Sequence, residues 1–237
     1  METLSHIGSN FTIFQREDSF KFGTDAVLLA RFARMRKKDV LYDFCSGTGA
    51  VGFFCHLLYQ PKEIGFVELD ETMCCLSEKT ATYNGIKEKC RFFCTDLSEF
   101  NREKNLSYAD CITVNPPYFL EHSGKTNQNP NLTGARHTDN FSHQVLFQKA
   151  YELLKDGGKL FLIQRVQNLA EILYLMRCAH IEPKRLRMVH SYKKKDATLF
   201  LVEGVKNGGV WLDCLPPLVL YRDNGEMTEE FKKMQEF

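Results

Sequence analysis

Residues 40–52 read VLYDFCSGTGAVG, and this stretch decides the fold expected of the chain. Residues 40–44 are a short apolar run of the kind that forms a buried strand, and Gly47 and Gly49 allow a tight turn into a helix. Strand-like and helix-like segments alternate from here onward, which predicts an α/β fold with a mostly parallel seven-stranded sheet flanked by helices. The expected strands are residues 40–44, 64–69, 91–94, 111–114, 159–164, 187–190 and 197–205.

The composition is typical of one large domain with a sizeable core. The chain has 237 residues, 43% of them hydrophobic, with 19 Phe, and α/β domains of this size are common. We expect a single domain over residues 1–237, with an N-terminal extension at 1–38, a core at 39–205 and a tail at 206–237. The formal net charge is only +1, so any surface for nucleic acid must be a local patch.

The cysteines and the termini favour a cytoplasmic protein. Nine cysteines are scattered without a Cys-x-x-Cys pair, which indicates a reducing compartment and predicts neither a disulfide framework nor a metal site. Residues 1–10 lack the basic start and apolar run of a signal peptide, and no apolar run is long enough for a membrane span. No obligate protein partner is evident from the sequence.

Four polar positions lie at, or just after, the ends of predicted strands, where ligands of open α/β sheets bind. They are Asp43, Glu68, Asp96 and Asn115. The glycine turn alone also matches a dinucleotide fingerprint, so an NAD-dependent oxidoreductase is one alternative. Asp43, however, would repel a pyrophosphate. A cationic ligand with a ribose and an adenine fits better, and we expect S-adenosylmethionine, with Glu68 on the ribose hydroxyls, Asp96 on the adenine amine and Asp43 near the ammonium group.

Asn115-Pro116-Pro117-Tyr118 follows the apolar run of residues 111–114. Each proline fixes its own φ and restricts the residue before it. The Asn115 side chain and the Pro116 carbonyl can then accept hydrogen bonds from one planar NH2 group, on which the Tyr118 ring can stack. This clamp suits the exocyclic amine of a base or the amide of a glutamine.

These motifs resemble those of class I S-adenosylmethionine-dependent methyltransferases, whose core is Rossmann-like. Residues 43–49 resemble the first motif of that class, and Glu68, Asp96 and the Asn-Pro-Pro-Tyr signature resemble the next three. More narrowly, the chain is similar to the bacterial valine-tRNA (adenine-37-N6)-methyltransferase family over nearly its whole length. Flanking likenesses include residues 22–25, 135–137, 157–158, 189–190 and 215–218.

The resemblance implies N6-methylation of adenine in tRNA and roles for named residues. The implied cofactor-binding residues are Thr24, Asp43, Cys45, Gly47, Gly49, Glu68, Asp96 and Asn115. The implied catalytic residues are Asn115, Pro116, Pro117 and Tyr118, and the implied substrate-binding residues are Tyr118, Arg136 and His137. Residues 191–195 depart from the family, where a basic turn containing proline is more usual.

Three other functions remain open. The same machinery could methylate a glutamine of a release factor, or adenine in DNA or rRNA, but we find neither the long N-terminal helical domain of the former enzymes nor a separate target-recognition domain. A non-catalytic RNA-binding module would not need the complete set of motifs.

Two basic clusters, at residues 31–38 and 184–195, predict an RNA footprint in an otherwise near-neutral chain, although a run of charge is usually only a solvated face.

Overall fold

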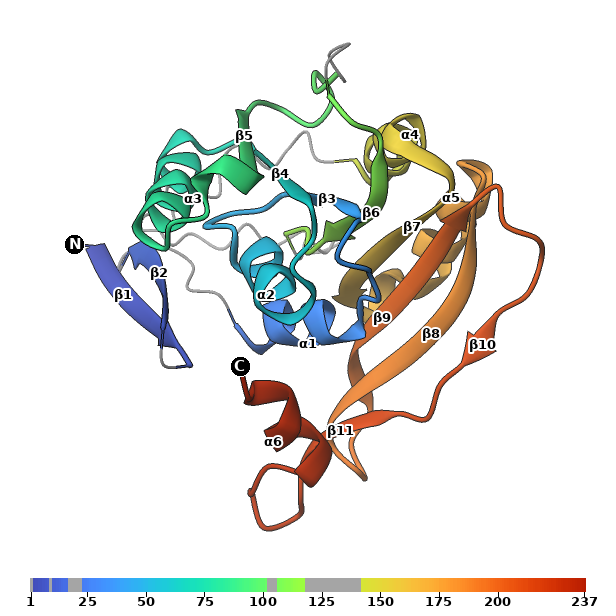
Figure 1. Ribbon diagram of the computed structural model, residues 1–237. Coiled ribbons are helices and arrows are strands. Elements are labelled where there is room, and N and C mark those ends of the chain that lie inside the picture. Colours follow the sequence, from blue (N-terminus) through green and yellow to red (C-terminus); the bar gives the residue numbers. More distant parts are fainter. Residues whose placement is uncertain (1, 9, 17–22, 102–105, 118–141) are drawn as a thin grey trace, which may run out of the picture.

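The computed structural model describes residues 2–8, 10–16, 23–101, 106–117 and 142–237. Its centre is a nine-stranded sheet, with helices packed around it (Figure 1). The strands of this sheet are β3 (Val40–Phe44), β4 (Glu63–Glu68), β5 (Cys90–Cys94), β6 (Ala109–Val114), β7 (Leu154–Arg165), β8 (Ile181–Tyr192), β9 (Ala197–Lys206), β10 (Asp213–Cys214) and β11 (Leu218–Tyr221). The α-helices are α1 (Thr24–Phe32), α2 (Ala50–Tyr59), α3 (Glu71–Tyr83), α4 (His143–Leu153), α5 (Leu169–Cys178) and α6 (Glu229–Gln235).

The sheet is mostly parallel, as the sequence predicts. Its strands run in the order β10-β8-β9-β7-β6-β3-β4-β5, and β11 also pairs with β8. Only β9 is antiparallel to its neighbours, β7 and β8. The strand that follows β3 along the chain, β4, lies on one side of it, whereas β6 lies on the other. This reversal of strand order creates the crevice in which open α/β sheets bind ligands.

The predicted number of strands, seven, is too low. The seven predicted strands are β3 to β9, and the 206–237 tail adds β10 and β11, both parallel to β8. β10 has only two residues, and β11 follows a Pro-Pro pair, so neither gives a strong sequence signal. After β11 the chain turns at Gly225, with φ +84°, and Thr228 then caps the start of α6.

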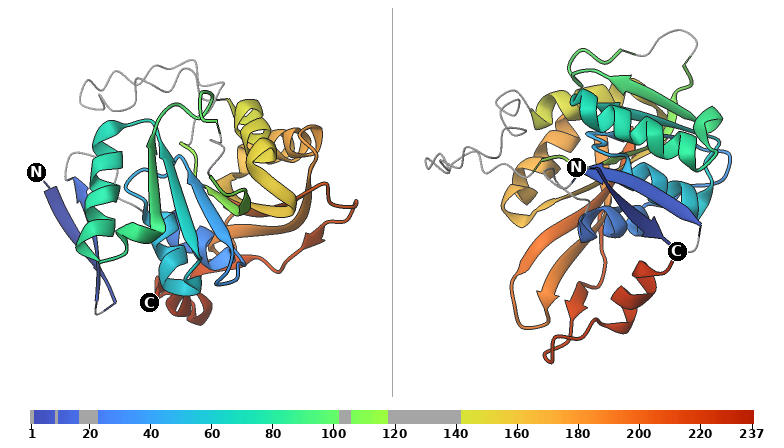
Figure 2. Two further views of the ribbon diagram at one scale, coloured as in Figure 1. Left: turned by 45° about the horizontal axis from the view of Figure 1, so that its top comes forward. Right: turned by 90° about the vertical axis from the view of Figure 1, so that its left-hand side faces the viewer.

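Two apolar cores lie on opposite faces of the sheet. Alternate residues of one strand enter different cores: Leu41 packs with α1, α2 and α6, whereas Tyr42 packs with α4 and α5. Figure 2 shows helices on both sides of the strands. Because both faces are covered, the central strands are largely apolar, and within residues 40–44 only Asp43 interrupts the apolar run.

A separate N-terminal hairpin was not predicted. It consists of β1 (Glu2–Ile7) and β2 (Phe11–Arg16) and packs on α3, away from the β10 side of the molecule (Figure 1). Side chains of α3 and of the residue that follows it replace a neighbouring strand: Asn84 accepts from the Thr12 amide at 3.0 Å and Thr80 accepts from the Phe14 amide at 3.0 Å. The edge of β2 is thereby satisfied.

Candidate functional site

Four parallel strands end at one edge of the sheet and bring the predicted site residues together. In the register of the sheet, Phe44 lies opposite both Val67 and Val114, and Glu68 lies opposite Cys94. The residues that directly follow these positions are therefore neighbours across the strand ends. The predicted residues at this edge are Cys45, Glu68, Asp96 and Asn115.

The turn between β3 and α2 has three residues in the left-handed region. Cys45, Gly47 and Gly49 have φ values of +53°, +54° and +79°. A Cβ atom on residue 49 would lie 2.5 Å from Ser77 Oγ, so this position requires glycine for space as well as for φ. A Cβ atom on Gly47 would meet nothing within 4 Å. The turn therefore presents open backbone at Gly47, where a ligand can approach closely.

The Asp43 carboxylate faces the interior of the protein. The residue is 1% exposed. Its Oδ1 accepts from Thr113 Oγ1 at 2.7 Å and its Oδ2 accepts from the Gly52 amide at 3.0 Å. Burial raises the pKa of Asp43 to about 7, against the two hydrogen bonds, which lower it. Asp43 thus ties β3 to β6 and to the first turn of α2, and a contact with an ammonium group stays a prediction.

The Glu68 carboxylate binds the glycine turn directly. Its Oε2 accepts from the Gly47 amide at 2.7 Å, and its Oε1 accepts from the amides of Leu69 at 2.9 Å and Asp70 at 3.0 Å. Burial raises the pKa of Glu68, while these amides oppose that shift. A carboxylate offers about four acceptor sites, so Glu68 can hold the turn and still accept from a ligand hydroxyl.

Three carboxylates surround Cys45. Burial raises the pKa of the Cys45 thiol well above its ordinary value, and Glu68, Asp43 and Asp96 raise it further. Asp96 follows β5, where its Oδ1 accepts from the Ser98 amide at 2.7 Å. The Thr95 amide donates to the Glu68 carbonyl at 2.9 Å and holds this segment beside β4. A site rich in carboxylates favours a ligand that carries positive charge, hydroxyl groups and amines.

The predicted clamp begins where β6 ends. Asn115 is half-buried, Pro116 is buried and Pro117 is exposed. Tyr118, Arg136 and His137 lie outside the described residues. Thr24 is the first residue of α1, with Gly23 as the N-cap residue and no side-chain cap, and its contact with a cofactor stays a prediction.

Three further polar residues near this edge were not among the predicted site residues. Thr113 is fully buried and supplies the hydroxyl that binds Asp43. Ser46 Oγ in the glycine turn and Gln164 Nε2 near the end of β7 are buried without a hydrogen-bond partner in the described parts of the chain. The sequence signal for Thr113 and Gln164 was a polar residue near the end of an apolar strand. Such a residue is buried, and buried polar groups normally have a hydrogen-bond partner.

The structure also has a cleft away from this edge. It has a volume of about 460 Å³ and opens at the opposite, amino edge of the sheet, between Arg34, Lys155 and Lys159. Within the described ranges, no group of three or more His, Cys, Asp or Glu side chains is arranged to hold a metal ion. No described helix combines the length and the apolar composition needed to cross a membrane.

Known proteins share this architecture. A crystal structure of a predicted O-methyltransferase from Agrobacterium tumefaciens superposes with a TM-score of 0.68, at 20% identity, over 89% of this chain and 95% of the other. Two curated relatives are both named tRNA1(Val) (adenine(37)-N6)-methyltransferase. The relative from Parabacteroides distasonis is 27% identical over 74% of this chain and 72% of its own length. The relative from Photobacterium profundum is 26% identical over 83% of each chain.

The match to a family model rests on the same segment that builds the site. The model described as "Methyltransferase small domain" matches residues 9–178. These residues include the glycine turn, the three acidic positions and Asn115. The chain therefore belongs to the methyltransferase small domain family.

Proposed function

We propose that this protein transfers a methyl group from S-adenosylmethionine to N6 of an adenine in tRNA, with position 37 of a valine tRNA as the expected target. The observation that carries the proposal is the placement of Asn115. It follows β6, the strand next to β3, so the clamp for an amine lies beside the glycine turn and its carboxylates. The names of the two curated relatives support the same substrate.

The residues at the strand ends fit S-adenosylmethionine, which supplies a methyl group on a positively charged sulfur. Gly47 presents open backbone, and the buried Ser46 hydroxyl is a polar group that lacks a partner within the described chain. Glu68 would accept from the ribose hydroxyls and Asp96 from the adenine amine. Cys45 and Thr24 are proposed as further contacts, and the three carboxylates favour the cationic end of the cofactor.

Asn115 and Pro116 supply the catalytic contacts in this proposal. The N6 lone pair of adenine is delocalised into the ring, so the amine is a poor nucleophile. When the Asn115 side-chain oxygen and the Pro116 carbonyl accept hydrogen bonds from its two N–H groups, the nitrogen becomes more pyramidal and its developing positive charge is stabilised. The remaining rate enhancement comes from holding the amine nitrogen in line with the methyl carbon. The amine loses its proton to solvent after transfer, so no strong base is required.

The target base must leave its stack to reach the clamp. Tyr118 is proposed to stack on the base in exchange, with Pro117 fixing the position of its backbone. Arg136 and His137 are proposed to contact phosphate or the unstacked base. These roles follow from the family resemblance.

We further propose that residues 1–237 act as one methyltransferase domain in the cytoplasm, without an obligate protein partner. Within the extension at 1–38, Thr24 is the residue proposed to reach the cofactor and RNA side of the core at 39–205, whereas residues 34–38 lie at the amino edge. The tail at 206–237 would complete the sheet. The pairing of β10 and β11 with β8 supports the last assignment.

The test is methyl transfer from isotope-labelled S-adenosylmethionine to total tRNA, followed by nucleoside analysis. We expect N6-methyladenosine in a valine tRNA. Duplex DNA, ribosomal RNA and purified release factors serve as competing substrates in the same assay. If the label entered DNA, ribosomal RNA or a release-factor glutamine and did not enter tRNA, the tRNA assignment would be overturned.

A further inference from the structure

Residues 34–38 of the first basic cluster and residues 193–195 of the second lie at opposite edges of the sheet. Residues 34–38 precede β3 and therefore lie at the amino edge, beside the 460 Å³ cleft. Lys193, Lys194 and Lys195 form the turn between β8 and β9. β9 is antiparallel to β7, with Leu199 opposite Arg165 at the end of β7, so this turn projects from the carboxyl edge, where Asn115 also lies.

Much of the amino-edge cluster stabilises the fold. The Arg31 guanidinium donates to the Met234 carbonyl at 3.1 Å and covers the Phe237 ring. Arg36 pairs with Asp39 at 3.1 Å. In the same cleft, Lys155 pairs with Asp110 at 2.8 Å. These contacts occupy Arg31 and Arg36, whereas Arg34, Lys37 and Lys38 are exposed at the edge opposite Asn115.

Most of the second cluster is paired as well, except at its tip. The Arg185 side chain binds Glu203, and Arg187 pairs with Glu230 at 2.7 Å. The Lys184 ammonium donates to the Gly209 carbonyl at 2.6 Å. Lys193, Lys194 and Lys195 are exposed, and none of them forms an ion pair with the described residues. We refer to these three lysines as the hairpin tip.

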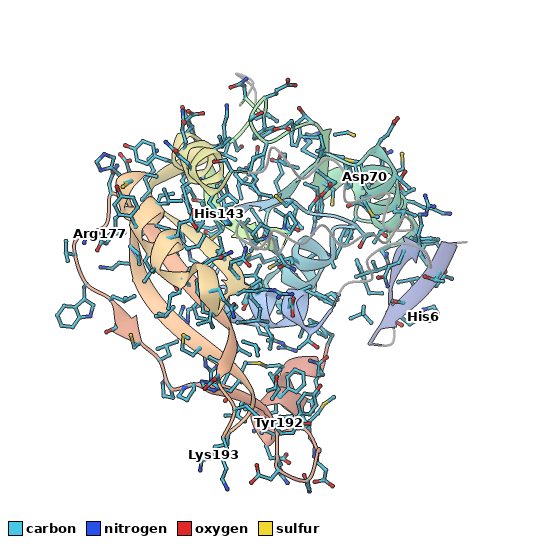
Figure 3. The ribbon with its side chains drawn as sticks, turned by 180° about the vertical axis from the view of Figure 1, so that it is seen from behind. His6, Asp70, His143, Arg177, Tyr192 and Lys193 are labelled. Atoms are coloured by element: carbon cyan, nitrogen blue, oxygen red, sulfur yellow. The ribbon has the colours of Figure 1, made fainter. Side chains whose placement is uncertain are left out.

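The hairpin tip is held in a defined conformation. The Lys195 carbonyl bonds to His190 Nδ1 at 2.7 Å, and the Lys195 amide donates to the Tyr192 carbonyl at 3.0 Å. Tyr192 lies opposite Tyr221 of β11, with ring centroids 5.8 Å apart. Figure 3 shows Tyr192 and Lys193 together at the end of the hairpin, near α6. The three ammonium groups are therefore presented on a braced support.

Charge is divided across the carboxyl edge of the sheet. The carboxylates of Glu68 and Asp96 lie at β4 and β5, on one side of Asn115. On the other side come Arg165, exposed at the end of β7, and then the hairpin tip. Neighbouring strands lie about 4.8 Å apart, so the base of the hairpin is on the order of 10–15 Å from the clamp. A polyanion is repelled from the first side and attracted to the second.

We propose that the hairpin tip binds the sugar–phosphate backbone of the tRNA substrate, at nucleotides that flank the target base. The inference rests on the proposed function for its substrate. These contacts position the RNA without reading its sequence, since lysines act on phosphates as point charges. They strengthen RNA binding and leave the methyl-transfer step to the residues at the clamp.

The test compares two triple variants with the same change in charge. Lys193→Glu/Lys194→Glu/Lys195→Glu changes the hairpin tip, and Arg34→Glu/Lys37→Glu/Lys38→Glu is the matched control at the amino edge. For the hairpin variant we expect at least a tenfold rise in the Kd and KM for tRNA, with kcat within twofold. Three lost phosphate contacts should also reduce the slope of log K against log salt by about 2–3. The control variant should stay within twofold of the unchanged protein.

Equal losses in both variants, or an unchanged Kd and salt slope in the hairpin variant, would overturn the proposal. Binding of S-adenosylhomocysteine and the thermal midpoint are measured for each variant, and Lys193→Ala/Lys194→Ala/Lys195→Ala replaces the glutamate triple if that variant does not fold. Failure of the proposed function is distinguishable, because it appears as absence of N6-methyladenosine in tRNA. Binding of tRNA is measured separately and does not require methyl transfer.

Discussion

The buried carboxyl group of Asp43 makes the stability of this protein depend on pH. Burial raises its pKa from 3.8 to about 7. In the unfolded chain the group ionises near its ordinary pKa, whereas in the folded protein it resists ionisation up to the higher value. The resulting loss of stability is therefore absent below the unfolded pKa, grows as the pH rises, and is complete above the folded pKa.

The magnitude follows from the two pKa values. A shift of roughly three units corresponds to about 4 kcal/mol above pH 7, at about 1.4 kcal/mol per unit. Between pH 5.5 and 8.0 the loss grows by about 2 kcal/mol, because over half of it is already present at pH 5.5. Asp43→Asn removes the ionisation and can keep both hydrogen bonds. The amide oxygen accepts from the Gly52 amide, and the NH2 group donates to the Thr113 hydroxyl.

The assay is urea unfolding at pH 5.5 and at pH 8.0 for the unchanged protein and for Asp43→Asn. Between pH 5.5 and pH 8.0, the free energy of unfolding of Asp43→Asn should fall by about 2 kcal/mol less than that of the unchanged protein. Asp156→Asn, at an exposed position, makes the same change in charge and should leave the pH dependence as it is. If Asp43→Asn and the unchanged protein lost equal stability between the two pH values, the reasoning from burial would be refuted.

Three further predictions concern the clamp, the ribose contact and the glycine turn. Asn115→Ala should lower kcat about 10²-fold or more and leave S-adenosylhomocysteine binding intact by calorimetry; turnover at the unchanged rate would exclude the role of Asn115. Glu68→Gln should raise the Kd for the cofactor by roughly tenfold, with tRNA binding unaffected, and an unchanged Kd would remove Glu68 from the cofactor site. Gly49→Ala should lower the free energy of unfolding by about 2 kcal/mol or more, whereas Gly47→Ala should lower it by about 1 kcal/mol, because of these two positions only residue 49 is crowded. Gly47→Ala should nevertheless abolish cofactor binding, because its methyl group would occupy the space where the ligand approaches the backbone. Equal unfolding midpoints for the two variants would contradict this.

The local sequence pattern was sufficient to predict the elements around the glycine turn and the edge of the sheet where a ligand would bind. Residues 40–52 alone predict a strand, a tight turn and a helix, and the structure has β3, the left-handed Gly47 and Gly49, and α2. Because parallel strands share one carboxyl edge, the position of Glu68, Asp96 and Asn115 just after predicted strands was enough to place them together. This inference needs only the direction of the strands.

Contacts between distant segments were beyond the reach of the sequence. The direction of the Asp43 side chain depends on the pairing of β3 with β6, which sets Asp43 opposite Thr113, 70 positions along the chain. The N-terminal hairpin was missed because its edge is completed by side chains at the end of α3, which no periodicity reveals.

The sequence by itself determined the alternating α/β order, the glycine turn and the position of Asn115 after the fourth predicted strand, since each depends on residues that are close along the chain. Only the tertiary structure decided how many strands the sheet has and which basic cluster shares an edge with Asn115. The reason is physical: strand order and the antiparallel direction of β9 arise from pairing across the whole domain, and burial and salt bridging then select which charges stay available.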